Sequence, residues 1–196
     1  MKRLFDIIFS ILGILFCSPI FVFLFLAVIF DSKGGAFYKQ IRVGRFNKNF
    51  RLIKFRTMRV GSDQKGLLTV GGLDSRITDV GFFIRKYKLD ELPQLFNILK
   101  GDMSIVGPRP EVRKYVDMYS AEQMRVLDVR PGLTDYASIE YINESEILAL
   151  AQDPEREYID KIMPDKLSLN MKYIAETGLI TDLKIIAKTF SKIVKS

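Results

Sequence analysis

The segment IIFSILGILFCSPIFVFLFLAVIF, residues 7–30, decides the architecture of this chain. Its 24 residues carry no charge, and only Ser10, Gly13, Ser18 and Pro19 among them are not apolar. A helix of this length would extend about 36 Å, which is enough to cross about 30 Å of hydrocarbon. No other stretch of the sequence is as long and as apolar, so the sequence predicts one membrane segment joined to a polar body.

Three kinds of membrane segment compete for this run. A signal peptide is disfavoured, because the run is too long and no small-x-small cleavage site follows it. The pair Ser18-Pro19 at its middle favours a re-entrant helix over a straight spanning one, since proline bends a helix and the serine hydroxyl can bond a freed carbonyl. Basic residues flank both ends, and positive charge prefers the cytoplasmic side. These residues alone leave the spanning and the re-entrant helix open.

The rest of the chain predicts a single domain, so we divide the protein into residues 1–32, the membrane helix, and residues 33–196, a cytoplasmic catalytic domain. Residues 36–43 and 50–58 alternate as strands do, and the Gly- and Asn-containing loop between them predicts a hairpin. Residues 61–79 are expected to form a long surface loop. The expected fold class is α+β, with helices at residues 89–100, 111–128 and 181–195.

The last of these helices is amphipathic. Leu183, Ile186, Phe190 and Ile193 lie on one side, whereas lysines line the other. A basic amphipathic helix in a protein that already contacts a bilayer is typical of an interfacial anchor. The alternative is a terminal helix packed on the core of the domain.

The composition excludes several kinds of chemistry. The chain has no histidine and one cysteine among its 196 residues, so a Ser-His-Asp triad, a His-ligated metal and an intrachain disulfide are all ruled out. Lys plus Arg exceeds Asp plus Glu by 30 to 23, a net charge of +7. Catalysis would therefore depend on carboxylates, hydroxyls, Lys and Arg, or an oxygen-liganded metal such as Mg²⁺.

The densest polar cluster is RKYKLDELPQ, residues 85–94. Asp90 and Glu91 follow three cations at a predicted helix start, where nearby positive charge favours the ionised carboxylates. An ionised carboxylate can attack phosphorus and is a hard ligand for Mg²⁺. The competing interpretation is ordinary helix capping by acidic residues.

A second cluster is GDMSIVGPRP, residues 101–110. Pro108 and Pro110 fix φ on both sides of Arg109, so this loop could direct a guanidinium toward a phosphate at low entropic cost. It could equally be a rigid turn in solvent. Further cations near strands or turns would suit a polyphosphate substrate if the fold gathers them. They are Arg85, Lys54, Arg56 and Arg130.

These motifs together resemble the signature of the monotopic phosphoglycosyl transferases, the bacterial sugar transferase family. The resemblance covers nearly the whole chain, as in members that consist of the catalytic domain alone, and it is specific because several motifs recur in order. They are LDELPQLFN at 89–97, KGDMS at 100–104, GPRP at 107–110, KFRTM at 54–58, RPGLT at 130–134, and the apolar run with its central Ser-Pro.

The resemblance implies transfer of a phosphosugar from a UDP-sugar to a polyprenol phosphate such as undecaprenyl phosphate, with release of UMP. Such a reaction starts the assembly of O-antigen, capsule or exopolysaccharide at the cytoplasmic face of the bacterial inner membrane. Membrane lipids, and no nucleic acid, would be its other partners, and a homodimer stays open. The membrane element of the family is the re-entrant helix around Ser18-Pro19.

The resemblance also implies roles for individual residues. Asp90 would be the nucleophile and would bind Mg²⁺, and Glu91 would complete the pair. Arg109 would hold substrate phosphate, with Arg85 a weaker candidate. The sequence departs from the family at Thr57, where many members have Ser, and at residues 135–138, where many have Gly, an aromatic residue, Ala and Gln.

Two other functions compete with this one. A glycosyltransferase that moves sugar without phosphate would release UDP instead of UMP. A basic protein without catalytic activity could bind acidic lipids through its positive charge, although this would not explain an Asp-Glu pair among cations.

Overall fold

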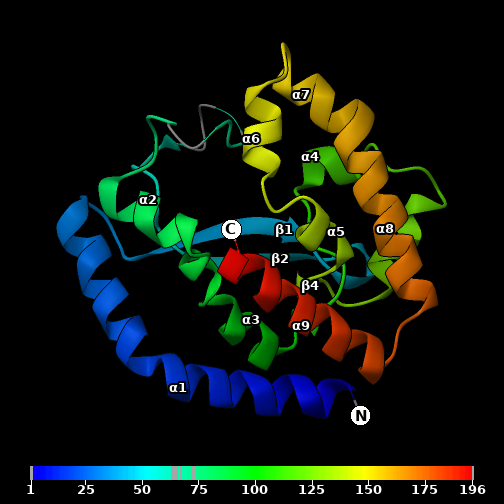
Figure 1. Cartoon of the computed structure of the whole chain (residues 1–196), viewed down its shortest axis with the longest axis horizontal. Coiled ribbons are helices and arrows are strands. Elements are labelled where there is room, and N and C mark those ends of the chain that lie inside the picture. The colour runs from blue at the N-terminus through cyan, green and yellow to red at the C-terminus, as the bar shows by residue number, and fades with distance from the viewer. Residues whose placement is uncertain (1, 63–65, 67, 72–73, 196) are drawn as a thin grey trace.

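The computed structural model describes residues 2–62, 66, 68–71 and 74–195 (Figure 1). The molecule is α+β: one long N-terminal helix, two small two-stranded sheets and a set of shorter helices around them. The antiparallel hairpin expected near residues 36–58 is confirmed as β1 (Phe37–Val43) and β2 (Asn49–Phe55), paired so that Phe37 lies opposite Phe55. Its turn contains the 3-10 helix η1 (Arg45–Asn47), where Phe46 and Asn47 have positive φ.

Helix α1 (Lys2–Asp31) contains the apolar run and is long enough to cross a membrane. It is helical without interruption through Ser18 and Pro19, and Figure 1 shows it bent between its two halves. Pro19 has no N–H to donate to the carbonyl of Leu15, and the Ser18 hydroxyl donates to that carbonyl instead at 2.8 Å. The break expected at Ser18-Pro19 is therefore a bend in a continuous helix, and the Ser18 hydroxyl takes the place of the missing N–H donor.

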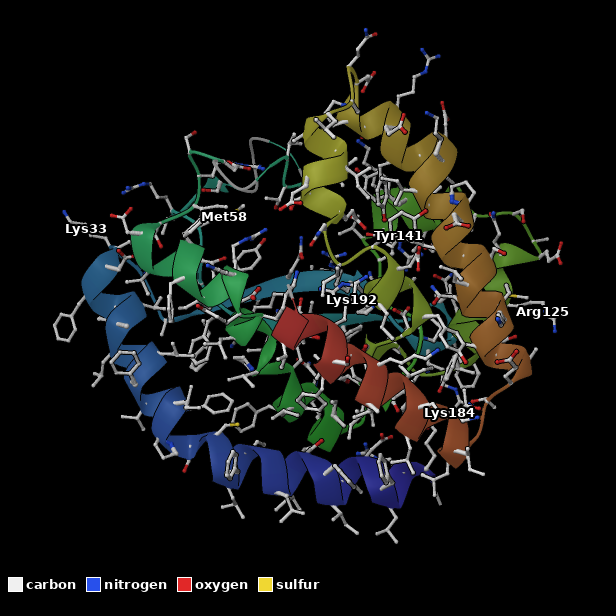
Figure 2. All side chains as sticks on the ribbon, viewed as in Figure 1. Lys33, Met58, Arg125, Tyr141, Lys184 and Lys192 are labelled. Atoms are coloured by element: carbon white, nitrogen blue, oxygen red, sulfur yellow. The ribbon has the colours of Figure 1, made fainter. Side chains whose placement is uncertain are left out.

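One face of α1 packs on the body, and the opposite face is exposed. Leu24 and Val28 join Phe55 and Ile84 in a buried cluster. On the opposite face, Phe16 is 82% exposed, and Figure 2 shows side chains of α1 pointing away from the rest of the molecule. An exposed apolar face along a helix of 30 residues indicates a lipid or protein partner.

Polar contacts fix the N-terminal end of α1. Buried Asp6 accepts hydrogen bonds from the Ser104 hydroxyl at 3.0 Å and from the Ile105 N–H at 3.1 Å. Arg3 donates to the carbonyls of Ile98 and Leu99, which terminate α3. The helix is thereby held against the segment that leads into the Pro-Arg-Pro loop.

The second sheet is a parallel pair that the sequence did not predict. Strand β3 (Ser104–Val106) pairs with β4 (Gly132–Thr134), so that Ser104 lies opposite Gly132. Gly107 and Gly132 pack back to back, because a Cβ on Gly132 would lie 2.1 Å from the Gly107 nitrogen. This close approach brings the RPG and PRP segments together.

The expected helix at residues 111–128 is wrong. The chain forms α4 (Arg113–Val116) and then the 3-10 helix η4 (Gln123–Asp128). Ser120 and Gln123 form a reciprocal capping pair between side chains and backbone N–H groups, with bonds of 2.8 and 3.2 Å. A capping box starts a new helical segment, so one continuous helix cannot cross Ser120.

The remaining helices complete the body. Residues 63–65, 67 and 72–73 of the expected loop lie outside the described residues; within the described ones, Arg76 donates to carbonyls of Ser62, Gly66 and Leu68. The other elements are α2 (Asp79–Lys86), η3 (Leu89–Glu91), α3 (Gln94–Lys100), α5 (Tyr136–Glu140), α6 (Glu144–Ala149), α7 (Pro154–Glu157), the π-helix η5 (Tyr158–Ile162), α8 (Met163–Ala175) and α9 (Leu179–Lys195).

Helix α9 is the amphipathic helix that the sequence predicts. Asp182 and Ile185 are buried, and Ile185 packs with Val106 and Tyr173. An apolar strip of the same helix stays exposed, including Ile180 at 71% and Phe190 at 66%. One face of α9 therefore packs on the domain, and the role of its exposed strip at a membrane surface stays a prediction.

Candidate active site

The adjacent carboxylates Asp90 and Glu91 lie in the turn η3, directly before α3. Lys88, which precedes this turn, has φ 55° and thus adopts the left-handed conformation that residues other than glycine rarely take. Strained backbone of this kind concentrates at functional sites. The turn places Asp90 in the interior, where the residue is only 6% exposed.

Lys54 on β2 faces both carboxylates. Its Nζ lies 3.1 Å from Oε1 of Glu91 and 3.9 Å from Oδ2 of Asp90. The strand alternation turns the Lys54 side chain to the face that packs on η3, and the hairpin thus supplies a cation from a distant part of the sequence.

Arg109 holds Glu91 with two nitrogens. Its Nη1 donates to Oε2 of Glu91 at 3.2 Å, and its Nη2 donates to Oε1. This paired geometry is the strong form of an Arg–carboxylate contact. About a third of the Arg109 side chain, 34%, stays exposed, so other N–H donors of the guanidinium can reach a ligand.

The two neighbouring carboxylates have opposite electrostatic environments. Burial raises the pKa of Asp90 above its ordinary value, and the nearby Lys54 charge offsets this only in part. Burial alone would also raise the pKa of Glu91, but Arg109 and Lys54 together hold it far below its usual range. Glu91 is thus a permanently ionised group that fixes two cations, while Asp90 keeps its oxygens for other chemistry.

Burial and the charge of Glu91 also shift the pKa values of Lys54 and Arg109. Burial lowers the pKa of Lys54, and Glu91 opposes that shift. Glu91 raises the pKa of Arg109, so this guanidinium stays charged. Arg85 contributes a further positive charge that lowers the pKa of Asp90, and its own guanidinium donates to Thr69 Oγ1 at 3.0 Å. The structure therefore brings together Asp90, Glu91, Lys54, Arg85 and Arg109.

Two cations that the sequence grouped with the site lie elsewhere. Arg56 is buried against the end of α1 and donates to the carbonyl of Ser32 at 2.7 Å. Arg130 donates to the carbonyl of Gly101 at 3.1 Å. In the described structure neither forms an ion pair with Asp90 or Glu91, and a part for them in substrate binding stays a prediction.

The Pro-Arg-Pro loop is fixed by its backbone. The Gly132 N–H donates to the carbonyl of Pro108 at 2.9 Å, and Arg42 donates to the carbonyl of Pro110 at 3.2 Å. Asp135, which is fully buried, accepts the N–H of Arg109 at 3.0 Å. These bonds hold the backbone of Arg109 independently of its side chain.

The positioning role of Asp135 was missed by the sequence reasoning. Its other oxygen accepts the Ser138 N–H at 2.6 Å, which caps the start of α5. An Asp three residues before a backbone N–H at a helix start is a recognisable capping signal. Its bond to the Arg109 N–H crosses 26 residues and had no signal in the sequence.

The donor set fits Mg²⁺ in one respect. Mg²⁺ usually takes one or two protein carboxylates together with substrate phosphates. Asp90 supplies one carboxylate that is not fully engaged by cations, whereas both oxygens of Glu91 are. The described residues contain no group of three acidic, His or Cys side chains that could hold a metal by themselves. Substrate phosphates and water are the other ligands that Mg²⁺ usually takes.

Comparison with known proteins identifies the family of the chain. The family model for bacterial sugar transferases matches residues 1–196. The sugar transferase EpsL of Bacillus subtilis is 37% identical over 197 residues, which cover 100% of this chain and 88% of EpsL.

Two relatives have names that state a reaction. A UDP-N-acetylgalactosamine-undecaprenyl-phosphate N-acetylgalactosaminephosphotransferase of Aeromonas hydrophila is 36% identical across 98% of this chain, which spans 43% of that protein. A UDP-glucose:undecaprenyl-phosphate glucose-1-phosphate transferase of Caulobacter vibrioides is 32% identical across 96% of this chain and 67% of its own length. With a family model that matches from the first residue to the last, this chain belongs to the bacterial sugar transferase family.

Proposed function

We propose that this protein is a phosphoglycosyl transferase that moves a phosphosugar from a UDP-sugar to undecaprenyl phosphate. The observation that carries the proposal is a buried Asp90 beside Lys54, with Glu91 and Arg109 locked together next to it. The names of the Aeromonas and Caulobacter relatives support the same donor and acceptor classes.

In the first step, an Asp90 carboxylate oxygen attacks the phosphorus that carries the sugar. The new bond is an acyl phosphate, and the bond from this phosphorus to the bridging oxygen breaks, so UMP leaves with the electron pair. Lys54 and Arg109 would neutralise charge on the phosphate oxygens. Phosphoryl transfer depends mainly on positioning and charge neutralisation, which suits a site without histidine.

In the second step, an oxygen of undecaprenyl phosphate attacks the same phosphorus. Asp90 leaves as a free carboxylate, and the product is undecaprenyl diphosphosugar. In the first step, Mg²⁺ held by Asp90 and the substrate diphosphate would supply further charge neutralisation. Glu91 keeps Arg109 and Lys54 in place throughout, because its pKa leaves it ionised at any physiological pH.

Membrane association places the site near its lipid substrate. The exposed apolar face of α1 supports insertion into the bilayer, and we propose that α1 enters and leaves the cytoplasmic face of the inner membrane. The bend at Pro19 supports this topology, as do the polar contacts of Lys2 and Arg3 with the body. A straight spanning helix would have to pull these two cations away from Asp182 and the end of α3.

The topology has a direct test. Replacing Ser18 by Ala and Pro19 by Leu should straighten α1, because the replacement for the proline restores the N–H that donates to the Leu15 carbonyl. A single cysteine added ahead of Met1, in a Cys17→Ser background, should be labelled only from the cytoplasm in the parent. It should become accessible from the periplasm in the double variant. Periplasmic labelling of the parent would contradict the re-entrant form.

The reaction is tested with a panel of UDP-sugars and undecaprenyl phosphate in detergent with Mg²⁺. We expect one or a few sugars to give UMP and a sugar-labelled lipid in equal amounts. Release of UDP would instead identify a glycosyltransferase that moves sugar alone. Binding to anionic vesicles with no nucleotide released from any donor would favour a protein without catalytic activity.

A further inference from the structure

Asn97 on α3 connects the helix that follows the acidic pair to the strand that carries Lys54. The residue is only 1% exposed. Its Nδ2 donates to the Arg51 carbonyl at 2.8 Å, and its Oδ1 accepts the Ile53 N–H at 3.0 Å. The same Nδ2 donates to Oδ2 of Asp102 at 3.3 Å. One side-chain amide thus bonds an N–H and a carbonyl of β2, directly before Lys54.

These two bonds take the place of a neighbouring strand. β2 pairs with β1 along one edge, and among the described residues no strand pairs with its other edge. Residues along a strand bond alternately to one side and to the other, so the carbonyl of Arg51 and the N–H of Ile53 point to the same edge. Buried backbone groups need hydrogen-bond partners. Asn97 supplies them where β2 passes α3.

Apolar packing holds β2 against α3 but does not fix its position along the helix. Leu52 of β2 packs with Leu95 and Ile98 of α3 in a buried cluster. Such contacts are not directional, whereas hydrogen bonds require a narrow range of distance and angle. The Nζ of Lys54 lies 3.1 Å from one carboxylate of the acidic pair and 3.9 Å from the other. A displacement of about 1 Å within a site of this kind can lower the rate about 10²-fold.

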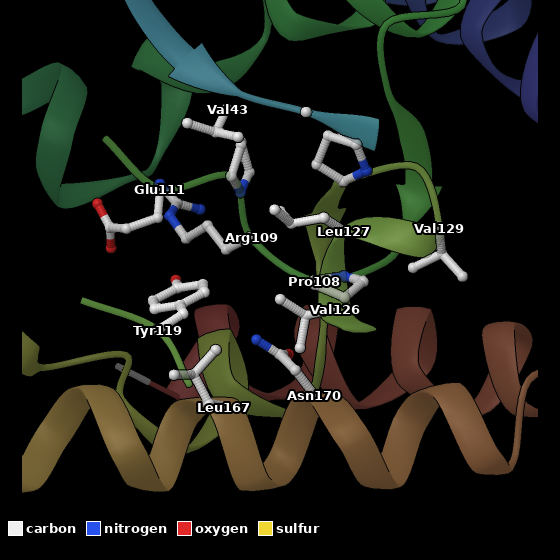
Figure 3. Close-up of a pocket in the computed structure, with 13 residues that line it drawn as sticks. Val43, Pro108, Arg109, Glu111, Tyr119, Val126, Leu127, Val129, Leu167 and Asn170 are labelled. Carbon is white, nitrogen blue, oxygen red and sulfur yellow. The ribbon is translucent and has the colours of Figure 1, made fainter. Parts of the chain in front are cut away.

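The hairpin is attached to the site at a second point that does not involve the Asn97 side chain. The N–H of Val43, at the end of β1, donates to the Glu111 carbonyl at 2.9 Å. Val43, Arg109 and Glu111 border one small cavity (Figure 3). The backbone carbonyl of Asn97 accepts the Gly101 N–H at 3.1 Å, so the end of α3 is held by the main chain. Truncating the Asn97 side chain should therefore loosen β2 near residues 51–54 and leave the other attachments in place.

We propose that Asn97 is a positioning residue for the transfer reaction, and that it acts through Lys54 by holding the free edge of β2. The proposal rests on the proposed function, in which Lys54 neutralises charge on the substrate phosphate. Asn97 itself touches neither the substrate nor the acidic pair. Its effect on the reaction therefore depends on the presence of the Lys54 ammonium, which distinguishes positioning from a general contribution to stability.

The test is a double-mutant cycle between Asn97 and Lys54, measured as kcat/KM with undecaprenyl phosphate and the UDP-sugar that the wild type uses. With Lys54 present, Asn97→Ala should lower kcat/KM about 10- to 100-fold, mainly through kcat, because the ammonium is displaced from the reacting phosphate. In Lys54→Gln, the same substitution should cost no more than about twofold, since the group that Asn97 positions is already gone. An equal loss in both backgrounds would indicate a merely structural role and would overturn the proposal.

Two further variants separate positioning from a loss of stability. Asn97→Asp keeps the size of the side chain and its acceptor, but an ionised carboxylate cannot donate to the Arg51 carbonyl. It should show the same dependence on Lys54. Ile162→Ala truncates a buried side chain in a different apolar cluster, so it should lower the melting temperature and affect kcat/KM equally in both backgrounds. Coupling of Ile162→Ala to Lys54 as strong as that of Asn97→Ala would contradict the proposal.

Hydrogen exchange at the Ile53 amide tests the same contact without any measurement of activity. In the wild-type protein this N–H should be protected, and in Asn97→Ala it should exchange about tenfold faster or more, while the Val43 amide stays protected. Fast exchange of Ile53 in the wild type would overturn the proposal. A wild type that releases no UMP from any donor would contradict the proposed function instead, so the two failures are distinguishable.

Discussion

Asp90→Asn should lower kcat/KM by about 10³-fold or more, because the amide keeps the shape of the side chain but cannot attack phosphorus. The effect should be largest in the first half-reaction. Wild-type enzyme incubated with a UDP-sugar and no lipid acceptor should release one equivalent of UMP and gain the mass of a phosphosugar. The variant should do neither, as measured by nucleotide chromatography and intact-protein mass spectrometry.

Asp117→Asn is the matched control, since the Asp117 side chain is 62% exposed and, among the described residues, pairs only with Arg113. It should retain full activity. Both variants should stay with the membrane fraction, because α1 is unchanged. Steady turnover by Asp90→Asn, or a covalent adduct on another residue, would remove the nucleophile assignment.

The pH dependence of kcat/KM is a second test of the role of Asp90. A protonated Asp90 cannot attack, so kcat/KM should rise with pH as Asp90 loses its proton. Burial raises the pKa of Asp90, and this acid limb should therefore lie at higher pH than for an exposed aspartate. Lys54 lowers that pKa, so Lys54→Gln should move the limb to still higher pH. A limb at the ordinary aspartate position would mean that another group controls the step.

The sequence predicted the elements whose patterns are local. The apolar run, the hairpin and the final amphipathic helix each follow from spacing along one segment. The parallel β3–β4 pair could not be predicted in this way, because each strand has three residues and their pairing joins segments 28 residues apart through Gly107 and Gly132. The error at residues 111–128 was avoidable, since Ser120 and Gln123 have the spacing of a capping box.

In the candidate site, too, local motifs were predictable, whereas contacts that depend on packing between distant segments were not. One short turn carries Asp90 and Glu91, and the rigid Pro-Arg-Pro turn carries Arg109. The fold brings the two turns together, as the motifs suggested. Lys54 and Arg56 would share one face of an extended strand, yet β2 ends at Phe55 and Arg56 turns to the end of α1. Where a strand ends is decided by packing, so alternation alone could not separate these two cations.

Arg109→Gln should lower kcat/KM by about 10²- to 10³-fold, the usual cost of removing a preorganised charge stabiliser. The paired contact with Glu91 disappears, and Lys54 is left as the main cation at that carboxylate. The loop itself should keep its place, because Asp135 holds the Arg109 N–H and not its side chain. Arg109→Lys should recover only part of the activity, since an ammonium cannot form the paired contact.

Single-turnover kinetics separate this defect from the loss of Asp90. In Arg109→Gln the covalent phosphosugar should still form to one equivalent, but slowly, because the nucleophile is intact while the charge that stabilises the transition state is not. Arg156→Gln is the control, as the Arg156 side chain is 79% exposed and its ion pair within the described part of the chain is with Asp160. A normal rate of adduct formation in Arg109→Gln would mean that Arg109 serves Glu91 alone and takes no part in binding phosphate.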